Sequence, residues 1–175
     1  MTGGIPATRE PVGCNRSDGK KPDGLTLIPW HKGKPLVWDF TCADTLAKSY
    51  VKATSKKSGE AARMRENFKK ALYEPLNEYF HFVPIAVETL GSWSEEGRNL
   101  VNKIGKILID ATGEKKSRSY LIQRLGIAIQ RGNAASILGT VPYSSGLEEI
   151  HPQTKVRFLR LGEITFRFYL HLSIR

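Results

Sequence analysis

The sequence predicts a mixed α/β domain in which helices flank a small β-sheet. Two runs of strand-favouring residues lie near the start of the chain, and long segments with helical periodicity follow them. One further apolar run lies between the helical segments. The predicted order is therefore strand, strand, helix, strand, helix, helix, which is typical of a layered α/β domain.

The first two strands are predicted to form a β-hairpin from Leu25–Ile28 and Leu36–Thr41. The segment between them contains Lys32-Gly33-Lys34, and a connection with glycine between two such runs is typical of a hairpin. The first 24 residues are rich in Gly and Pro turn signals and predict no regular element.

A helix is predicted from Ser58, as its N-cap, to the residue before Pro75. Helical spacing of its apolar residues indicates a buried stripe of Ala61, Met64, Phe68, Ala71 and Leu72. The following run, Tyr79–Thr89, has the composition of a buried strand, and Pro84 within it indicates an edge strand or a bulge.

Two more helices are predicted from their start and stop signals. Residues 94–96, a serine and two glutamates, favour a helix N-terminus, and Gly113 ends that helix. The last helix is predicted over Ser117–Arg131, with Gly132 as its stop. We assign residues 1–141 to one domain and residues 142–175, which are basic and aromatic, to an extension of unrelated character.

The charge balance favours a polyanionic partner. Lys and Arg total 27 against 17 Asp and Glu, so the net charge is +10 and the pI is about 9.7, which points to nucleic acid before an acidic membrane surface. No apolar run approaches the roughly 18 residues of a membrane span, and no secretory signal is visible. With only Cys14 and Cys42, no disulfide framework is expected, so we expect an intracellular protein with no membrane partner.

Two aspartates in the predicted hairpin form the main candidate site. Asp23 precedes the first strand, and Asp39 lies in the second, sixteen positions later, so the hairpin can bring the two carboxylates face to face. Such a pair is stabilised by a divalent cation such as Mg²⁺, or by a shared proton. The alternative for Asp23 is ordinary turn chemistry, whereas Asp39 lies between two aromatic residues and needs a partner.

The stretches 20–24 (KKPDG) and 34–41 (KPLVWDFT) resemble the PD…D motif of restriction-like endonucleases. They are most similar to the endonuclease domain at the C-terminal end of non-LTR retrotransposon reverse-transcriptase polyproteins. The similarity continues through 83–91 and 127–134 and covers residues 6–141. It implies a PD-(D/E)XK fold, a mixed sheet flanked by helices, and cleavage of a DNA phosphodiester with Mg²⁺ or Mn²⁺. In a retrotransposon this nick primes reverse transcription, so the resemblance also implies a nuclear location.

Under this resemblance Asp23 and Asp39 are the metal ligands and Glu10 is an accessory carboxylate. Thr41 stands where the family has a lysine two residues after the second acid. The candidates for the missing charge are three downstream lysines, Lys48, Lys52 and Lys56. The alternative for each of them is a solvated basic face.

The family also carries a zinc knuckle, a helix and a polymerase domain ahead of the motif. Only 22 residues precede Asp23 here, so we expect an N-terminally truncated copy that lacks the first helix and the reverse-transcriptase domain. If that helix covers one face of the sheet, Leu27 and Val37 are expected to be exposed.

Basic residues in two places are candidates for nucleic-acid contacts. They are Lys20 and Lys21 beside the first aspartate and Arg118, Arg124 and Arg131 on the last helix. Such residues grip phosphates without regard to sequence, although solubility is the alternative reading. Glu88 either approaches the metal or has a structural role, and the four histidines are scattered without ligand spacing.

Three functions are compatible with these observations. The first is a metal-dependent DNA endonuclease. The second is a module that binds DNA or RNA without cutting it, and the third is a non-functional remnant of a mobile element. Retention of both aspartates favours the first, whereas Thr41 and the missing upstream parts favour the other two.

Overall fold

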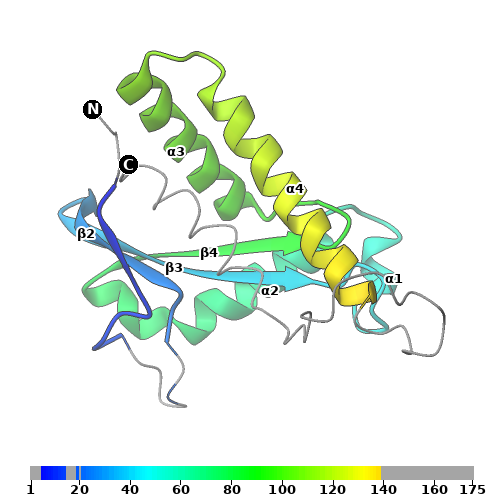
Figure 1. Ribbon diagram of the computed structural model, residues 1–175. Coiled ribbons are helices and arrows are strands. Elements are labelled where there is room, and N and C mark those ends of the chain that lie inside the picture. The colour runs from blue at the N-terminus through cyan, green and yellow to red at the C-terminus, as the bar shows by residue number, and fades with distance from the viewer. Residues whose placement is uncertain (1–4, 15–18, 20, 139–175) are drawn as a thin grey trace.

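The computed structural model describes residues 5–14, 19 and 21–138 of the 175-residue chain (Figure 1). A four-stranded sheet lies at its centre, in the order β1-β2-β3-β4. The strands are β1 (Ala7–Arg9), β2 (Gly24–His31), β3 (Lys34–Ala43) and β4 (His81–Glu88). Lys20 and the extension 142–175 lie outside the described residues.

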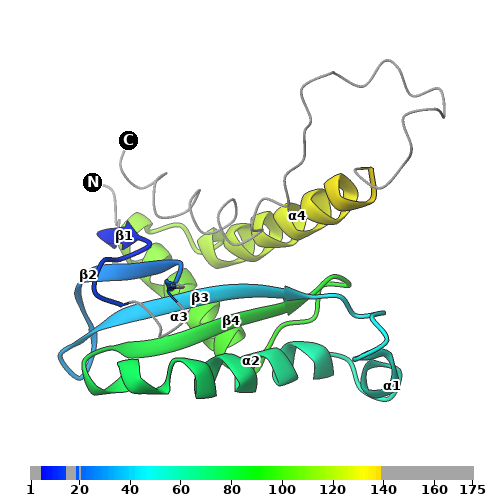
Figure 2. The ribbon, with the colours of Figure 1, turned by 90° about the horizontal axis from the view of Figure 1, so that it is seen from below.

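Helices cover both faces of this sheet. They are α1 (Val51–Thr54), α2 (Glu60–Leu72), the 3₁₀ helix η1 (Glu74–Glu78), α3 (Glu95–Thr112) and α4 (Ser117–Leu138). Figure 2 shows α2 on one side of the sheet and α4 on the other, and α4 packs along α3. The predicted α/β class, with a mixed sheet between helices, is therefore confirmed.

The strand pairing confirms the predicted hairpin. β1 pairs with β2 and β2 with β3 in antiparallel fashion, whereas β3 and β4 are parallel. Lys32 and Gly33 connect β2 to β3 with φ angles of 48° and 78°, and two residues at positive φ form the tight turn that suits a twisted hairpin. β4 ends the strand order, so Pro84 lies in an edge strand, as predicted.

Alternation along β3 divides the core into two layers. Leu36 and Trp38 pack with β4 and with Leu100 of α3, whereas Val37 packs with Tyr73 and Phe82 on the α2 side. Apolar side chains on both faces explain why β3 is the central strand of the hydrophobic core.

The expectation of two exposed residues is half right. Leu27 on β2 is 63% exposed, but Val37 is fully buried. The prediction for Val37 is wrong because the Tyr73 ring, just after α2, packs on that residue. α2 and its C-terminal turn therefore cover the β3 part of this face.

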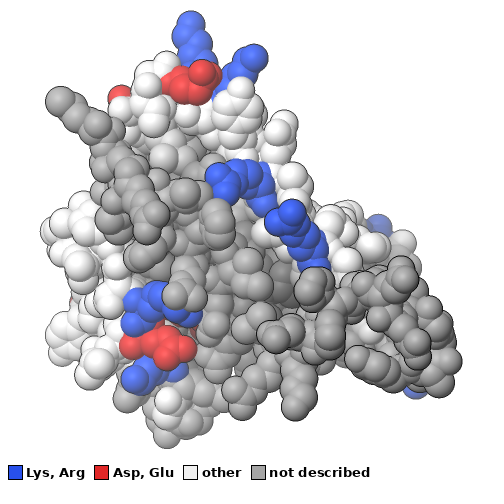
Figure 3. All heavy atoms as spheres, in the orientation of Figure 1, with Lys and Arg blue, Asp and Glu red and all other residues white. Residues whose placement is uncertain are grey.

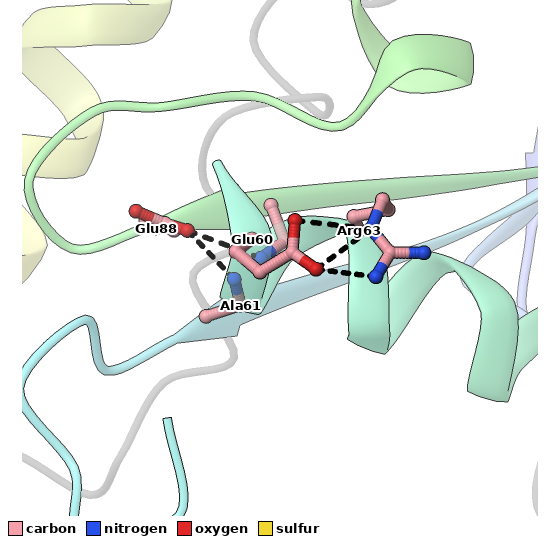
Figure 4. Close-up of polar contacts among 5 residues, drawn as sticks. Glu60, Ala61, Arg63 and Glu88 are labelled. Carbon is pink, nitrogen blue, oxygen red and sulfur yellow. Dashed lines mark hydrogen bonds and ion pairs between the residues drawn. The ribbon is translucent and has the colours of Figure 1, made fainter. Parts of the chain in front are cut away.

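α2 begins one residue later than predicted, and the side of the helix that faces the core is not the predicted one. Gly59, with φ 84°, precedes its first residue, and Glu88 on β4 accepts hydrogen bonds from the backbone N–H groups of Ala61 (2.9 Å) and Ala62 (3.3 Å) (Figure 4). Glu88 therefore has the structural role, because its carboxylate satisfies the free N–H groups of the helix terminus. Figure 4 also shows the exposed Glu60–Arg63 pair on the first turn of α2.

The predicted apolar stripe of α2 is wrong at three of its five positions, since Ala71 is exposed, as are Met64 and Phe68. Met64 is 41% and Phe68 54% exposed, whereas the buried positions of the helix are Ala61, Ala62 and Glu66. Glu66 accepts a hydrogen bond from the backbone N–H of Glu96 (3.0 Å) in the first turn of α3. The side of α2 that carries Glu66 therefore faces the core, where its carboxylate binds the N-terminus of α3.

α3 has the predicted bounds, from Ser94 as N-cap to Gly113 at φ 72°. α4 instead continues through Gly132 to Leu138, so the predicted stop is wrong. A glycine inside a helix costs only about 1 kcal/mol, and Ala134 and Ala135, strong helix formers, follow it. Among the described residues, neither these helices nor the shorter ones are long and apolar enough to cross a membrane.

Gly24, the first residue of β2, is predicted to be intolerant of any side chain. A Cβ at this position would lie 2.1 Å from an atom of the buried Trp38 ring. Gly24→Ala should therefore destabilise the fold by about 2–3 kcal/mol through overpacking, as measured by urea denaturation. Gly126→Ala is the matched control, because an added Cβ there meets nothing within 4 Å, and alanine should stabilise α4 by about 0.5–1 kcal/mol. Equal stability of the two variants would contradict the argument.

Candidate active site

Asp23 and Asp39 lie next to each other across β2 and β3. The backbone N–H of Asp23 donates to the Trp38 carbonyl (3.0 Å), and Asp23 Oδ2 accepts from the backbone N–H of Phe40 (2.6 Å). Asp23 thus contacts the residues on both sides of Asp39. The hairpin produces this arrangement because Gly24 pairs with Trp38, so the aspartates occupy the next position on each strand.

Asp39 is buried on the α2 side of the sheet and is held by two residues from the end of that helix. It is only 5% exposed. Its Oδ1 accepts a hydrogen bond from the hydroxyl of Tyr73 (3.2 Å), and its Oδ2 forms an ion pair with Lys69. Because an unpaired buried carboxylate is costly, the ammonium group of Lys69 and the hydroxyl of Tyr73 supply the partners that this buried side chain needs.

Lys69 lies beside Asp39, and the sequence analysis did not identify this lysine as a candidate site residue. Its side chain is 14% exposed, and its Nζ lies 5.9 Å from the centroid of the Tyr73 ring. The one signal in the sequence was that Glu66, Lys69 and Tyr73 recur at helical spacing, on a different side of α2 from Met64 and Phe68.

The three lysines predicted to supply the missing charge lie elsewhere. Lys48, Lys52 and Lys56 are exposed residues in and around α1, beyond the end of β3. They form no ion pair with other described residues, so the structure does not bring them to Asp39. Thr41, two residues along β3 from Asp39, is half-buried.

The two aspartates fit a hard divalent cation by their donor chemistry. Mg²⁺ is commonly held by one or two carboxylates together with water and substrate phosphates, and here an ammonium group already balances the charge on Asp39. Glu10 lies at φ 40°, and its backbone N–H donates to the Asp23 carbonyl (3.3 Å). Its side chain is exposed. Within the part of the chain that the structure describes, no three His, Cys, Asp or Glu side chains gather as metal ligands, so Glu10 does not complete a three-carboxylate cluster.

The predicted phosphate-binding residues fall into two regions. Lys21 is half-buried two residues before Asp23. Arg118, Arg124 and Arg131 are exposed on α4, where Figure 3 shows basic side chains along the outer surface of the helix. α4 packs on α3, whereas Asp39 faces α2, so these arginines do not surround the two aspartates.

Comparisons with protein-family models, with curated proteins and with solved structures find no match for this chain. The function has to be inferred from the residues of the site themselves.

Proposed function

We propose that the chain is a retrotransposon-derived, Mg²⁺- or Mn²⁺-dependent DNA endonuclease-like domain of the PD-(D/E)XK type. It would hydrolyse a phosphodiester bond to nick DNA in the nucleus, as the priming step for a reverse transcriptase supplied by another domain or chain. The observation that carries the proposal is the pairing of Asp23 with Asp39 on adjacent strands, with Lys69 held on Asp39. The mixed sheet between helices is compatible with this fold.

Each residue of the site has a distinct role in this proposal. Asp23 and Asp39 would hold the metal ion, which when bound supplies charge neutralisation and an activated water. Tyr73 fixes the orientation of Asp39 through Oδ1. Lys69, released from Asp39, places a positive charge beside the phosphate, where negative charge develops during cleavage. Lys69 would thus do what the resemblance assigned to a lysine at position 41.

Nicking of supercoiled plasmid tests this function directly. At low salt with Mg²⁺ or Mn²⁺ we expect the wild-type chain to convert supercoiled to open-circular DNA, and chelation by EDTA to stop it. Asp39→Asn keeps the shape of the side chain but removes the charge that binds metal, so nicking should fall at least about 100-fold. A thermal melt of both proteins is the control for folding. Nicking by the folded variant at the wild-type rate would exclude Asp39 from the active site.

A non-catalytic nucleic-acid-binding module is the second candidate. The observation that favours it is the closed state of Asp39, which is buried and paired with Lys69, together with the lack of a third ligand among the described residues. In that case the chain should shift DNA in a gel, with the shift fading as salt rises. No nicking should accompany it with either metal.

A further inference from the structure

Two histidines that are fifty residues apart in the sequence meet at one end of the sheet. His31 ends β2 and His81 begins β4, and their ring centroids are 5.1 Å apart. They meet because β3 lies between these strands, with His31 paired to Lys34 and His81 paired to Leu36. The two histidines are ordinary strand residues, as the sequence predicted, but their proximity could not be read from their spacing in the sequence.

Two lysines lie at the same end of the sheet, and neighbouring groups hold both in place. Lys34 Nζ donates to the carbonyl of Asn77 (2.8 Å). Lys103 of α3 holds its Nζ 4.6 Å from the centroid of the Trp30 ring, a cation–π geometry. An ammonium group that is already oriented loses less conformational freedom when it binds an anion.

His81 has charged and titratable neighbours on several elements. Burial and then His31 lower the pKa of His81 below its usual value, and Lys103 and Lys34 add to the lowering. Glu96 of α3 acts in the opposite direction. Two lysines and two histidines thus lie at this end of the sheet, with one carboxylate, that of Glu96, near His81.

We infer that this group of residues binds backbone phosphates of nucleic acid. We call it the sheet-end patch, and it consists of Trp30, His31, Lys34, His81 and Lys103. The inference rests on the proposed function and names a surface by which the domain would hold its substrate. A metal ion fits the patch poorly, because two ammonium groups repel it and the described residues offer no third ligand beside the histidines.

The position of the patch determines which phosphates it contacts. Leu36, the partner of His81, is three residues from Asp39 along β3, which is about 10 Å, or roughly three steps of a DNA strand. Leu36 and Asp39 point to opposite faces of β3. Because His31, Lys34 and His81 stand at strand ends, the patch lies at the end of the sheet, and under the proposed function it would contact phosphates that flank the cleaved bond.

The test measures binding of a fluorescein-labelled 30-base-pair DNA duplex to the full chain in EDTA. Fluorescence anisotropy reports the binding, and the titration is repeated at several salt concentrations. The double variant Lys34→Gln/Lys103→Gln should raise Kd by about tenfold and reduce the slope of log K against log salt by about 1.8. The matched control is Lys57→Gln/Lys115→Gln, which removes two charges from exposed sites outside the patch. If a thermal melt shows that the double variant is not folded, Lys103→Gln alone, at an exposed position, replaces it.

A pH series separates a phosphate contact from a structural effect. Bound phosphate favours the imidazolium form, whereas in the free chain His81 is shifted toward the neutral form. Wild-type affinity should therefore rise as the pH falls from 8 to 6, and His81→Gln should flatten this rise.

The outcomes distinguish the patch from the proposed function. If the wild-type chain binds no duplex even at low salt, the proposed function fails and the patch fails with it. If the wild-type chain binds, but the patch and control variants lose affinity equally, only the assignment of the patch is overturned.

Discussion

Lys69→Met is expected to reduce the rate of DNA nicking by about 10²- to 10⁴-fold while leaving DNA binding nearly unchanged. Methionine keeps most of the length of the side chain but removes the charge that is paired with Asp39. The loss should fall on kcat rather than on KM, because in the proposed site Lys69 would lie beside the reacting phosphate and contribute little to the extended DNA contact. Single-turnover nicking at saturating protein measures this directly.

Lys70→Met is the matched control for this experiment. Lys70 is the next residue on α2, but it pairs with Glu66 (3.1 Å) and Glu96 (2.7 Å) on another side of the helix. Its loss should change the nicking rate by no more than about threefold. If instead Lys56→Met abolishes nicking and Lys69→Met does not, the sequence-based assignment is right, and Lys69 is only a counter-ion of Asp39.

The same variant makes a second prediction about the metal. If Asp39 binds a divalent cation as proposed, that ion would compete with the Lys69 ammonium for the same carboxylate. Lys69→Met should therefore melt at a lower temperature than the wild type in EDTA, because a buried charge is left without its partner. Added Mg²⁺ should raise its melting temperature by more than it raises that of the wild type. An equal Mg²⁺ effect on both proteins would mean that the metal does not bind at Asp39.

The parts of the fold that the sequence predicted well are those with local signals. The hairpin has its turn at Lys32–Gly33, and α3 has its cap and its glycine stop within its own segment. β1 was missed because its three residues gain their structure from pairing with β2, about seventeen positions away. The end of α4 was misplaced because Gly132 is a weak stop when helix-forming residues follow it.

The same distinction between local and long-range contacts applies to the candidate site. Asp23 and Asp39 belong to one hairpin, so their spacing was enough to place them together. Lys69 comes thirty residues after Asp39, and no local pattern connects the two. The apolar residues Met64 and Phe68 suggested the wrong side of α2. The buried side instead carries Ala61, Ala62 and Glu66, and Lys69 of the same helix pairs with Asp39.

Tyr73→Ala is expected to destabilise the fold by about 3–5 kcal/mol, the largest loss predicted here for any single side chain. Tyr73 is 1% exposed, and its ring centroid lies 4.6 Å from that of Phe82. The same ring covers Val37 of β3. Removing it leaves a cavity between α2 and the sheet, which the regular strands cannot close. Urea denaturation followed by circular dichroism measures the loss.

Tyr73→Phe separates the two contributions of this residue. Phenylalanine keeps the ring on Phe82 but removes the hydroxyl that donates to Asp39 Oδ1, which should cost about 1.5–3 kcal/mol, as for a hydrogen bond to a charged group. The variant should remain folded, yet nick DNA more slowly, because Asp39 loses the contact that fixes its orientation. A Tyr73→Phe protein as unstable as Tyr73→Ala would mean that the hydroxyl carries the stability, and unchanged nicking would remove Tyr73 from the site. The expected result, a small loss of stability with a larger loss of activity, requires that a core side chain also positions Asp39.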